Sequence, residues 1–155
     1  AGGAVRADLL AQFLADPYFS RAAPKSTGRD DFHPAWLERH LSAHAAQASP
    51  RDVQATLAAL TAHSVAEALL RAMPGVCELV ICGGGARNTD LLRRLQQALP
   101  SVTCRPSDDS GIPAEQVEAA AFAWLAQQTL SELPGNLPAV TGAAGPRVLG
   151  AVYPA

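Results

Sequence analysis

The sequence predicts an α/β fold of about one domain. Residues 77–82 form a short, mostly apolar segment typical of a strand, residues 101–105 and 148–153 are two further short strand candidates, and segments with helical periodicity separate the three. A run of three glycines at 83–85 lies between the first of these strands and a helix. Alternating strands and helices favour an α/β architecture, and 155 residues is close to the length of one compact domain.

The first part of the chain is expected to be helical with one long loop. Apolar residues recur at helical spacing over 5–14, and this helix is expected to end at Asp16, because the residue before a proline avoids the helical region. Residues 18–33 show no periodicity and predict a loop. Pro34 is suited to the first turn of a short helix that follows the loop.

A long helix and the first strand come next. Ser49 can cap a helix whose first residue is Pro50, and its apolar face continues to about residue 73. The apolar segment 77–82 then predicts a strand buried on both faces. Either Asn88 or Thr89 can cap the helix that follows the glycines.

The last part of the chain predicts one further helix and a final strand. A helix opens after Pro113 and presents an apolar face, and its many alanines permit close approach to a neighbouring element. A segment rich in glycine and proline follows at 134–146, before the expected terminal strand at 148–153.

Composition excludes several classes of protein. The chain is 48% hydrophobic and 17% charged with a net charge of −2, which is typical of a soluble globular protein and gives no basic surface for nucleic acid. We find no apolar stretch near the roughly 18 residues of a membrane span, so no membrane association is expected. The three cysteines, Cys77, Cys82 and Cys104, lack zinc-site spacing and are interpreted as buried thiols in a reducing cytoplasm.

The glycine run is the strongest candidate for a binding site. Gly83, Gly84 and Gly85 would let a ligand approach the backbone, and the helix start after Asn88 offers free amide donors to an anion or a nucleotide. No lysine follows the glycines, as it would in a phosphate-binding loop, and the spacing is not that of the dinucleotide fingerprint. A tight turn without a ligand is an equally good interpretation of the spacing alone.

Two other groups of polar residues are candidates for ligand contacts. Lys25, Ser26, Thr27 and Arg29 bring two cations and two hydroxyls together in one loop, where they could hold phosphate oxygens or sugar hydroxyls. On the sequence alone an ordinary solvated loop is the favoured interpretation, because loops are ordinarily polar and exposed. The Glu118 carboxylate could accept hydrogen bonds from a sugar, although spacing alone favours an acidic residue that complements the dipole of the helix in its first turns.

Several segments resemble segments of the anhydro-N-acetylmuramic acid kinase family and occur in the same order along the chain. Together they cover nearly the whole chain, and they lie at residues 16–19, 24–29, 52–57, 60–62, 82–88, 118–126 and 136–143. The resemblance implies a ribonuclease H-like fold, as in actin-like ATPases, with ATP between two lobes. Residues 1–155 would be the carboxyl-terminal nucleotide- and sugar-binding lobe, an incomplete second lobe without its amino-terminal partner.

The same resemblance implies roles for the candidate residues. The glycines, with Asn88, would form the adenosine-binding turn, Glu118 would bind the sugar, and the loop from Lys25 to Arg29 would lie near the nucleotide or the closing cleft. The helix after Pro113 would connect the lobes.

The activity implied is ATP- and Mg²⁺-dependent conversion of 1,6-anhydro-N-acetylmuramic acid to N-acetylmuramic acid 6-phosphate in peptidoglycan recycling. The catalytic aspartate would precede this chain, so the chain alone is expected to be inactive, and the complete protein to be a cytoplasmic homodimer. Two alternatives remain: a non-catalytic actin-like nucleotide-binding or regulatory module, and a sugar-binding domain with no nucleotide role.

Overall fold

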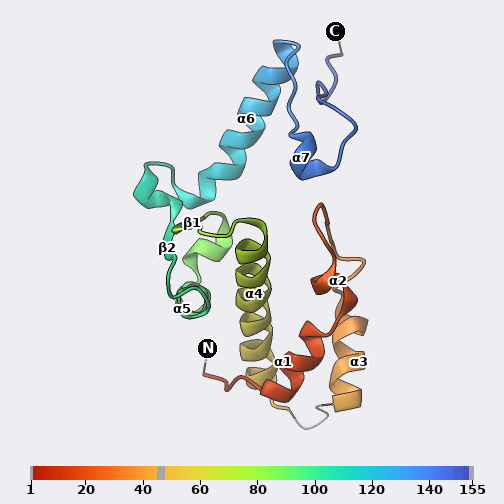
Figure 1. The fold of residues 1–155 in the computed structure, drawn as a ribbon, viewed down its shortest axis with the longest axis vertical. Coiled ribbons are helices and arrows are strands. Elements are labelled where there is room, and N and C mark those ends of the chain that lie inside the picture. Colours follow the sequence, from red (N-terminus) through yellow and green to blue (C-terminus); the bar gives the residue numbers. More distant parts are fainter. Residues whose placement is uncertain (1, 45–47, 154–155) are drawn as a thin grey trace.

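The computed structural model describes residues 2–44 and 48–153 and shows an α/β arrangement with a small parallel sheet (Figure 1). The helices are α1 (Ala7–Leu14), α2 (Pro17–Ser20), α3 (Pro34–His44), α4 (Pro50–Ala72), α5 (Thr89–Ala98), α6 (Val117–Leu130) and α7 (Pro138–Thr141). The strands are β1 (Glu78–Ile81) and β2 (Thr103–Pro106), and the 3₁₀ turns are η1 (Gly84–Arg87), η2 (Ser107–Ser110) and η3 (Ala114–Gln116). The α/β class is therefore confirmed, with helix α2 inside the expected loop and α3 longer than predicted.

The first core cluster lies between α1, α3 and α4. Phe13 of α1 is fully buried, and its ring stacks on that of Trp36 of α3 with centroids 4.9 Å apart. The Asp16 carboxylate accepts hydrogen bonds from the Tyr18 amide and from Trp36 Nε1, at 2.9 Å each. Asp16 therefore caps α2 and also fixes the indole that closes this core.

Helix α4 is the central element of the molecule (Figure 1) and begins where the sequence predicts, with the Ser49 hydroxyl accepting from the Asp52 amide. By length and composition it is the one helix of the described residues that could cross a membrane, so the expectation that no segment was long and apolar enough is wrong. The core helix of a soluble protein meets the same criteria. One third of this apolar stretch is buried, and α4 packs against both α1 and α5, so we interpret it as the central packing helix of the described chain, with part of its surface exposed.

Strands β1 and β2 pair in parallel, and α5 connects them. Leu79 of β1 packs on a second core cluster that includes Leu99 and Val102. The opposite face of β1 is exposed, so the prediction of a strand buried on both faces is wrong. The described chain places helices against only one side of this two-stranded sheet.

The cysteines follow the same pattern. Cys77 and Cys82 flank β1 and are exposed, and Cys104 in β2 is partly buried. The interpretation of all three as buried thiols is therefore wrong, because the sheet around them is covered incompletely.

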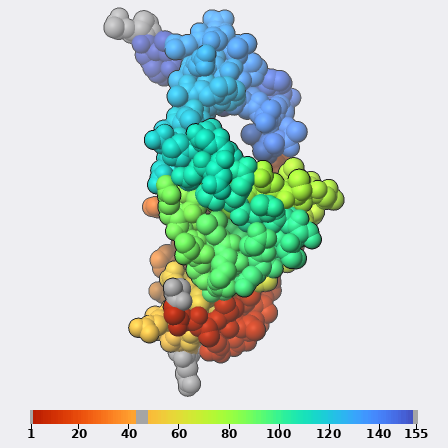
Figure 2. Space-filling model, turned by 90° about the vertical axis from the view of Figure 1, so that its left-hand side faces the viewer, coloured from red at the N-terminus to blue at the C-terminus, as the bar shows by residue number. Residues whose placement is uncertain are grey.

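Helix α6 and the segment after it form an extension beyond the α4–α5 body (Figures 1 and 2). No described residue of α6 is buried, and its exposed apolar side chains include Phe122 and Trp124. In Figure 2 the teal η2 and η3 turns join the blue α6–α7 part to the green body, and an opening is visible beside this junction. The alanines of α6 thus face no neighbouring element within the described chain.

The expected terminal strand at 148–153 does not form. The chain instead folds back on the end of α6, where the Thr129 hydroxyl donates to the Leu149 carbonyl. Just before it, Asn136 Oδ1 accepts from the Arg147 amide at 2.6 Å, and Asn136 Nδ2 donates to the Gly145 carbonyl at 3.2 Å. A strand requires a partner strand, and no strand of the described residues lies beside this segment.

Candidate nucleotide site

The three glycines form a turn that leads from β1 into η1, and we call Gly83, Gly84 and Gly85 the glycine turn. Gly83 has φ +72° and ψ −170°, a conformation almost restricted to glycine. A Cβ atom added at Gly83 or Gly84 would have no neighbour within 4 Å. Backbone geometry therefore explains glycine at 83, whereas nothing in the described chain requires it at 84, so the backbone there is open to a ligand.

The helix after the turn has the predicted cap. Asn88 Oδ1 accepts from the Leu91 amide at 3.1 Å, and Asp90 adds a carboxylate to the first turn of α5. Of the two candidate caps, the structure thus selects Asn88. The Asp90 carboxylate accepts hydrogen bonds from Arg94 and Arg93, which lower its pKa to about 2.

Arg87, at the end of η1, is a residue that the sequence analysis did not select. Its Nε donates to Glu115 Oε1 at 2.9 Å, and its Nη2 lies 2.7 Å from the same oxygen and 3.3 Å from Asp108 Oδ1. The hydrogen bond to Glu115 raises the pKa of Arg87, and the same bond lowers the pKa of Glu115. Asp108 and Glu115 lie more than twenty residues away in sequence, so helical or strand periodicity could not have revealed this cluster.

Glu118 lies in the first turn of α6 and is exposed. The start of this helical segment is tied to the glycine turn, because the Gly83 amide donates to the Ala114 carbonyl at 2.8 Å. The structure thus brings the elements that carry the proposed nucleotide and sugar residues next to each other.

The loop at residues 25–29 lies elsewhere, below α7 in Figure 1. A Cβ atom on Gly142 would lie 3.0 Å from Pro24 Cγ, which shows how close this loop is to the 136–143 segment. Lys25 Nζ donates to the carbonyls of Tyr18 and Phe19 at 3.0 Å each, and Thr27 Oγ1 donates to Asp31 at 2.8 Å. Two of the four candidate side chains therefore already stabilise the loop, whereas Ser26 and Arg29 are exposed.

Lys25 also lines a cavity of about 270 Å³ against the last turns of α4, together with Arg21 and Arg71. Three cationic side chains therefore surround one hollow, although the rest of its wall is alanine.

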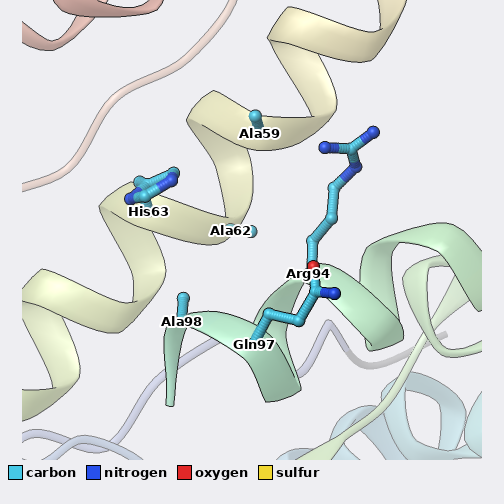
Figure 3. Close-up of a pocket in the computed structure, with 6 residues that line it drawn as sticks. All are labelled: Ala59, Ala62, His63, Arg94, Gln97 and Ala98. Carbon is cyan, nitrogen blue, oxygen red and sulfur yellow. The ribbon is translucent and has the colours of Figure 1, made fainter. Parts of the chain in front are cut away.

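A smaller pocket of about 150 Å³ lies between α4 and α5 (Figure 3). Its lining consists of Ala59, Ala62, His63, Arg94, Gln97 and Ala98. Figure 3 shows the Arg94 side chain extending toward Ala59, away from His63, and Arg94 Nε is bonded to Asp90 at 2.7 Å. The polar side chains of this pocket do not point toward a common centre, so we do not propose a ligand-binding site there.

The described residues contain no preformed cluster of three metal ligands. Among residues 2–44 and 48–153, no group of three His, Cys, Asp or Glu side chains is placed to hold a metal ion. Asp108 is already bonded to Arg87 and, at 3.3 Å, to the Ala114 amide. Mg²⁺ that accompanies a nucleotide is usually held by one or two carboxylates together with waters and phosphate oxygens, so it does not require a cluster of three protein ligands.

The arrangement around the glycine turn is typical of a class of nucleotide- or anion-binding proteins. A strand, a glycine turn and a capped helix in an α/β unit form a site suited to a nucleotide or another anion. Comparison with known proteins identifies the family: the chain belongs to the anhydro-N-acetylmuramic acid kinase family, whose profile matches residues 1–155.

Curated relatives agree with this assignment. An anhydro-N-acetylmuramic acid kinase of Cupriavidus pinatubonensis is 59% identical over 155 residues, which is 99% of this chain and 41% of the relative. Kinases of the same name from Cupriavidus metallidurans and Ralstonia nicotianae are each 52% identical over 99% of this chain, and the matched regions are 41% and 40% of these relatives. The chain therefore spans about two fifths of the length of the curated relatives that it matches.

Proposed function

We propose that residues 1–155 are the carboxyl-terminal, nucleotide- and sugar-binding lobe of a two-lobed kinase with a ribonuclease H-like, actin-like fold. The complete protein would use ATP to convert 1,6-anhydro-N-acetylmuramic acid to N-acetylmuramic acid 6-phosphate in peptidoglycan recycling. The observation that carries the proposal is the glycine turn between β1 and the capped helix α5, in a chain that belongs to this kinase family.

Each candidate residue has a distinct role in this proposal. The glycine turn and Asn88 form the adenosine side of the ATP site, and Glu118 accepts hydrogen bonds from the sugar. Ser26 and Arg29 in the 25–29 loop face the closing cleft, while Lys25 and Thr27 hold the loop in shape.

Helix α6 connects the two lobes in the complete protein. Its exposed apolar side chains support this role, because Phe122 and Leu130 are 64% and 73% exposed in this chain and would be covered by a second lobe. The catalytic aspartate and the ligands of Mg²⁺ would lie in the other lobe, so this chain alone would be inactive. We place the complete protein in the cytoplasm, where ATP is available, as a homodimer that sedimentation analysis can test.

The direct test is an assay of the complete protein for ATP-dependent formation of a 6-phosphorylated sugar from 1,6-anhydro-N-acetylmuramic acid. Glu118→Gln is expected to raise the KM for the sugar, and Gly84→Val the KM for ATP. Absence of turnover by the wild-type complete protein would refute the proposal. The sequence and intact mass of the source protein test where residues 1–155 lie within it.

The non-catalytic alternative makes a different prediction. A stand-alone nucleotide-binding module would bind ATP by itself, whereas one wall of a cleft would bind it weakly or not at all, and calorimetry on this chain separates the two. The names of the relatives favour the kinase. A sugar-binding domain without a nucleotide role would keep its ligand affinity in Gly84→Val.

A further inference from the structure

Arg87 is at the centre of a closed set of contacts among three short turns. From η1 its guanidinium contacts Glu115 of η3 and Asp108 of η2. Asp108 Oδ2 in turn accepts from the Ala114 amide at 3.3 Å, and the Ala114 carbonyl accepts from the Gly83 amide at 2.8 Å. We call Arg87, Asp108 and Glu115 the arginine clamp.

The arginine clamp has a sugar-side end and a nucleotide-side end. Turn η3 runs directly into α6 at Val117, so Glu115 lies three residues before Glu118 on one continuous helical segment. Arg87 directly follows Ala86, a buried residue next to the glycine turn. A displacement of η1 would therefore be transmitted to the start of α6 through the guanidinium and the Gly83–Ala114 hydrogen bond.

We propose that Arg87 is a positioning residue that couples nucleotide binding at the glycine turn to sugar binding at Glu118. The inference rests on the proposed function, because it needs both ligands to bind at the sites named above. Coupling of this kind is a free energy shared by two sites, and each ligand changes the affinity of the other by the same factor.

The exposure of the clamp separates coupling from folding. The side chains of Arg87 and Glu115 are both 57% exposed, and ion pairs at such positions contribute little to stability. The two core clusters contain none of the three clamp residues. Removing the Arg87 side chain should therefore leave the fold and the Gly83–Ala114 hydrogen bond intact while it removes the side-chain link between η1 and η3.

The test measures the dissociation constant of the sugar for the complete protein by calorimetry, with and without a non-hydrolysable ATP analogue. The ratio of the two constants is the coupling factor. In Arg87→Ala the coupling factor is expected to be about 2- to 10-fold closer to one than in the wild type, because two weak exposed ion pairs that act together are lost. The affinity for the sugar without nucleotide should change less than twofold.

Arg93→Ala is the matched control. Arg93 is 52% exposed and pairs with Asp90 within α5, so its removal deletes an arginine–carboxylate pair without disconnecting any two elements. It should keep the wild-type coupling factor. Arg87→Lys should restore part of the coupling, because an ammonium can hold Glu115 but lacks the fork that reaches a second carboxylate.

The outcomes distinguish the inference from the proposed function. No sugar turnover by the wild-type complete protein contradicts the proposed function itself. Wild-type turnover with a coupling factor of one, or a factor unchanged in Arg87→Ala, overturns the coupling role alone. If Arg87→Ala fails to fold, Glu115→Gln, which keeps the Asp108 contact, is tested against the same two outcomes.

Discussion

Two neighbouring glycines in the glycine turn should respond differently to the same substitution: alanine at 83 should change stability, and alanine at 84 should change nucleotide binding. Gly83 has φ +72°, whereas Gly84 does not have a left-handed φ. Both positions have open space where a Cβ atom would lie. Alanine at 83 therefore meets a backbone penalty and no steric clash, and alanine at 84 meets neither.

The size of each effect follows from this geometry. A residue other than glycine in the Gly83 conformation costs about 1–3 kcal/mol of unfolding free energy. Gly84→Ala should change stability by about 0.5 kcal/mol or less, as for an exposed surface substitution. The added methyl group at 84 would instead lie where the nucleotide approaches the backbone in the proposed site.

The two variants are compared by urea unfolding and by the KM for ATP of the complete protein. Gly83→Ala should lower the unfolding midpoint, and Gly84→Ala should raise the KM with an unchanged midpoint. If Gly84→Ala destabilises the protein as much as Gly83→Ala, the argument from φ is wrong. If its KM for ATP equals that of the wild type, the backbone at 84 does not approach the nucleotide.

Three further predictions concern the body of the molecule. Thr56 is fully buried, and its Oγ1 accepts a hydrogen bond from the Arg6 amide at 3.0 Å. Thr56→Val should therefore lower the unfolding free energy by about 1–3 kcal/mol, whereas Thr61→Val, at an exposed position, should change it little. Equal effects of the two substitutions in urea unfolding would contradict this prediction. Leu99 is 1% exposed, and Leu99→Ala should cost about 2–5 kcal/mol in the same measurement, with a loss below 1 kcal/mol counting against a packed second core. The Asp90 pKa of about 2 lies below its usual 3.8, so its stabilising effect should be complete above about pH 4 and be lost as the pH falls toward 2. The stability difference between wild type and Asp90→Asn should shrink over that range, and a constant difference would exclude the ionised carboxylate as its cause.

Local signals in the sequence predicted much of the secondary structure. The caps at Ser49 and Asn88 were predictable because a cap depends on residues within one turn of the helix. Both paired strands were also predicted, since β1 lies in a mostly apolar segment and β2 in a short segment between a helix-ending proline and a polar turn. The helix α2 was missed because four residues are too few to show periodicity.

Features that depend on distant partners could not be predicted in this way. The segment at 148–153 has the composition of a strand, but pairing requires a neighbour that the described chain does not place there. Burial of β1 was overestimated because a helix covers only one of its faces. No local sequence pattern indicated a role for Arg87, because its side chain contacts Glu115, which lies 28 residues further along the chain.

The sheet has a consequence for how this part of the protein folds. The two paired strands leave two open edges, each with unpaired backbone N–H and C=O groups. Any strand of the proposed complete protein that paired with β1 or β2 would satisfy these backbone groups and stabilise this unit. The melting temperature of this unit should therefore be higher in the proposed complete protein than in residues 1–155 alone, and amide exchange in β1 and β2 should slow most.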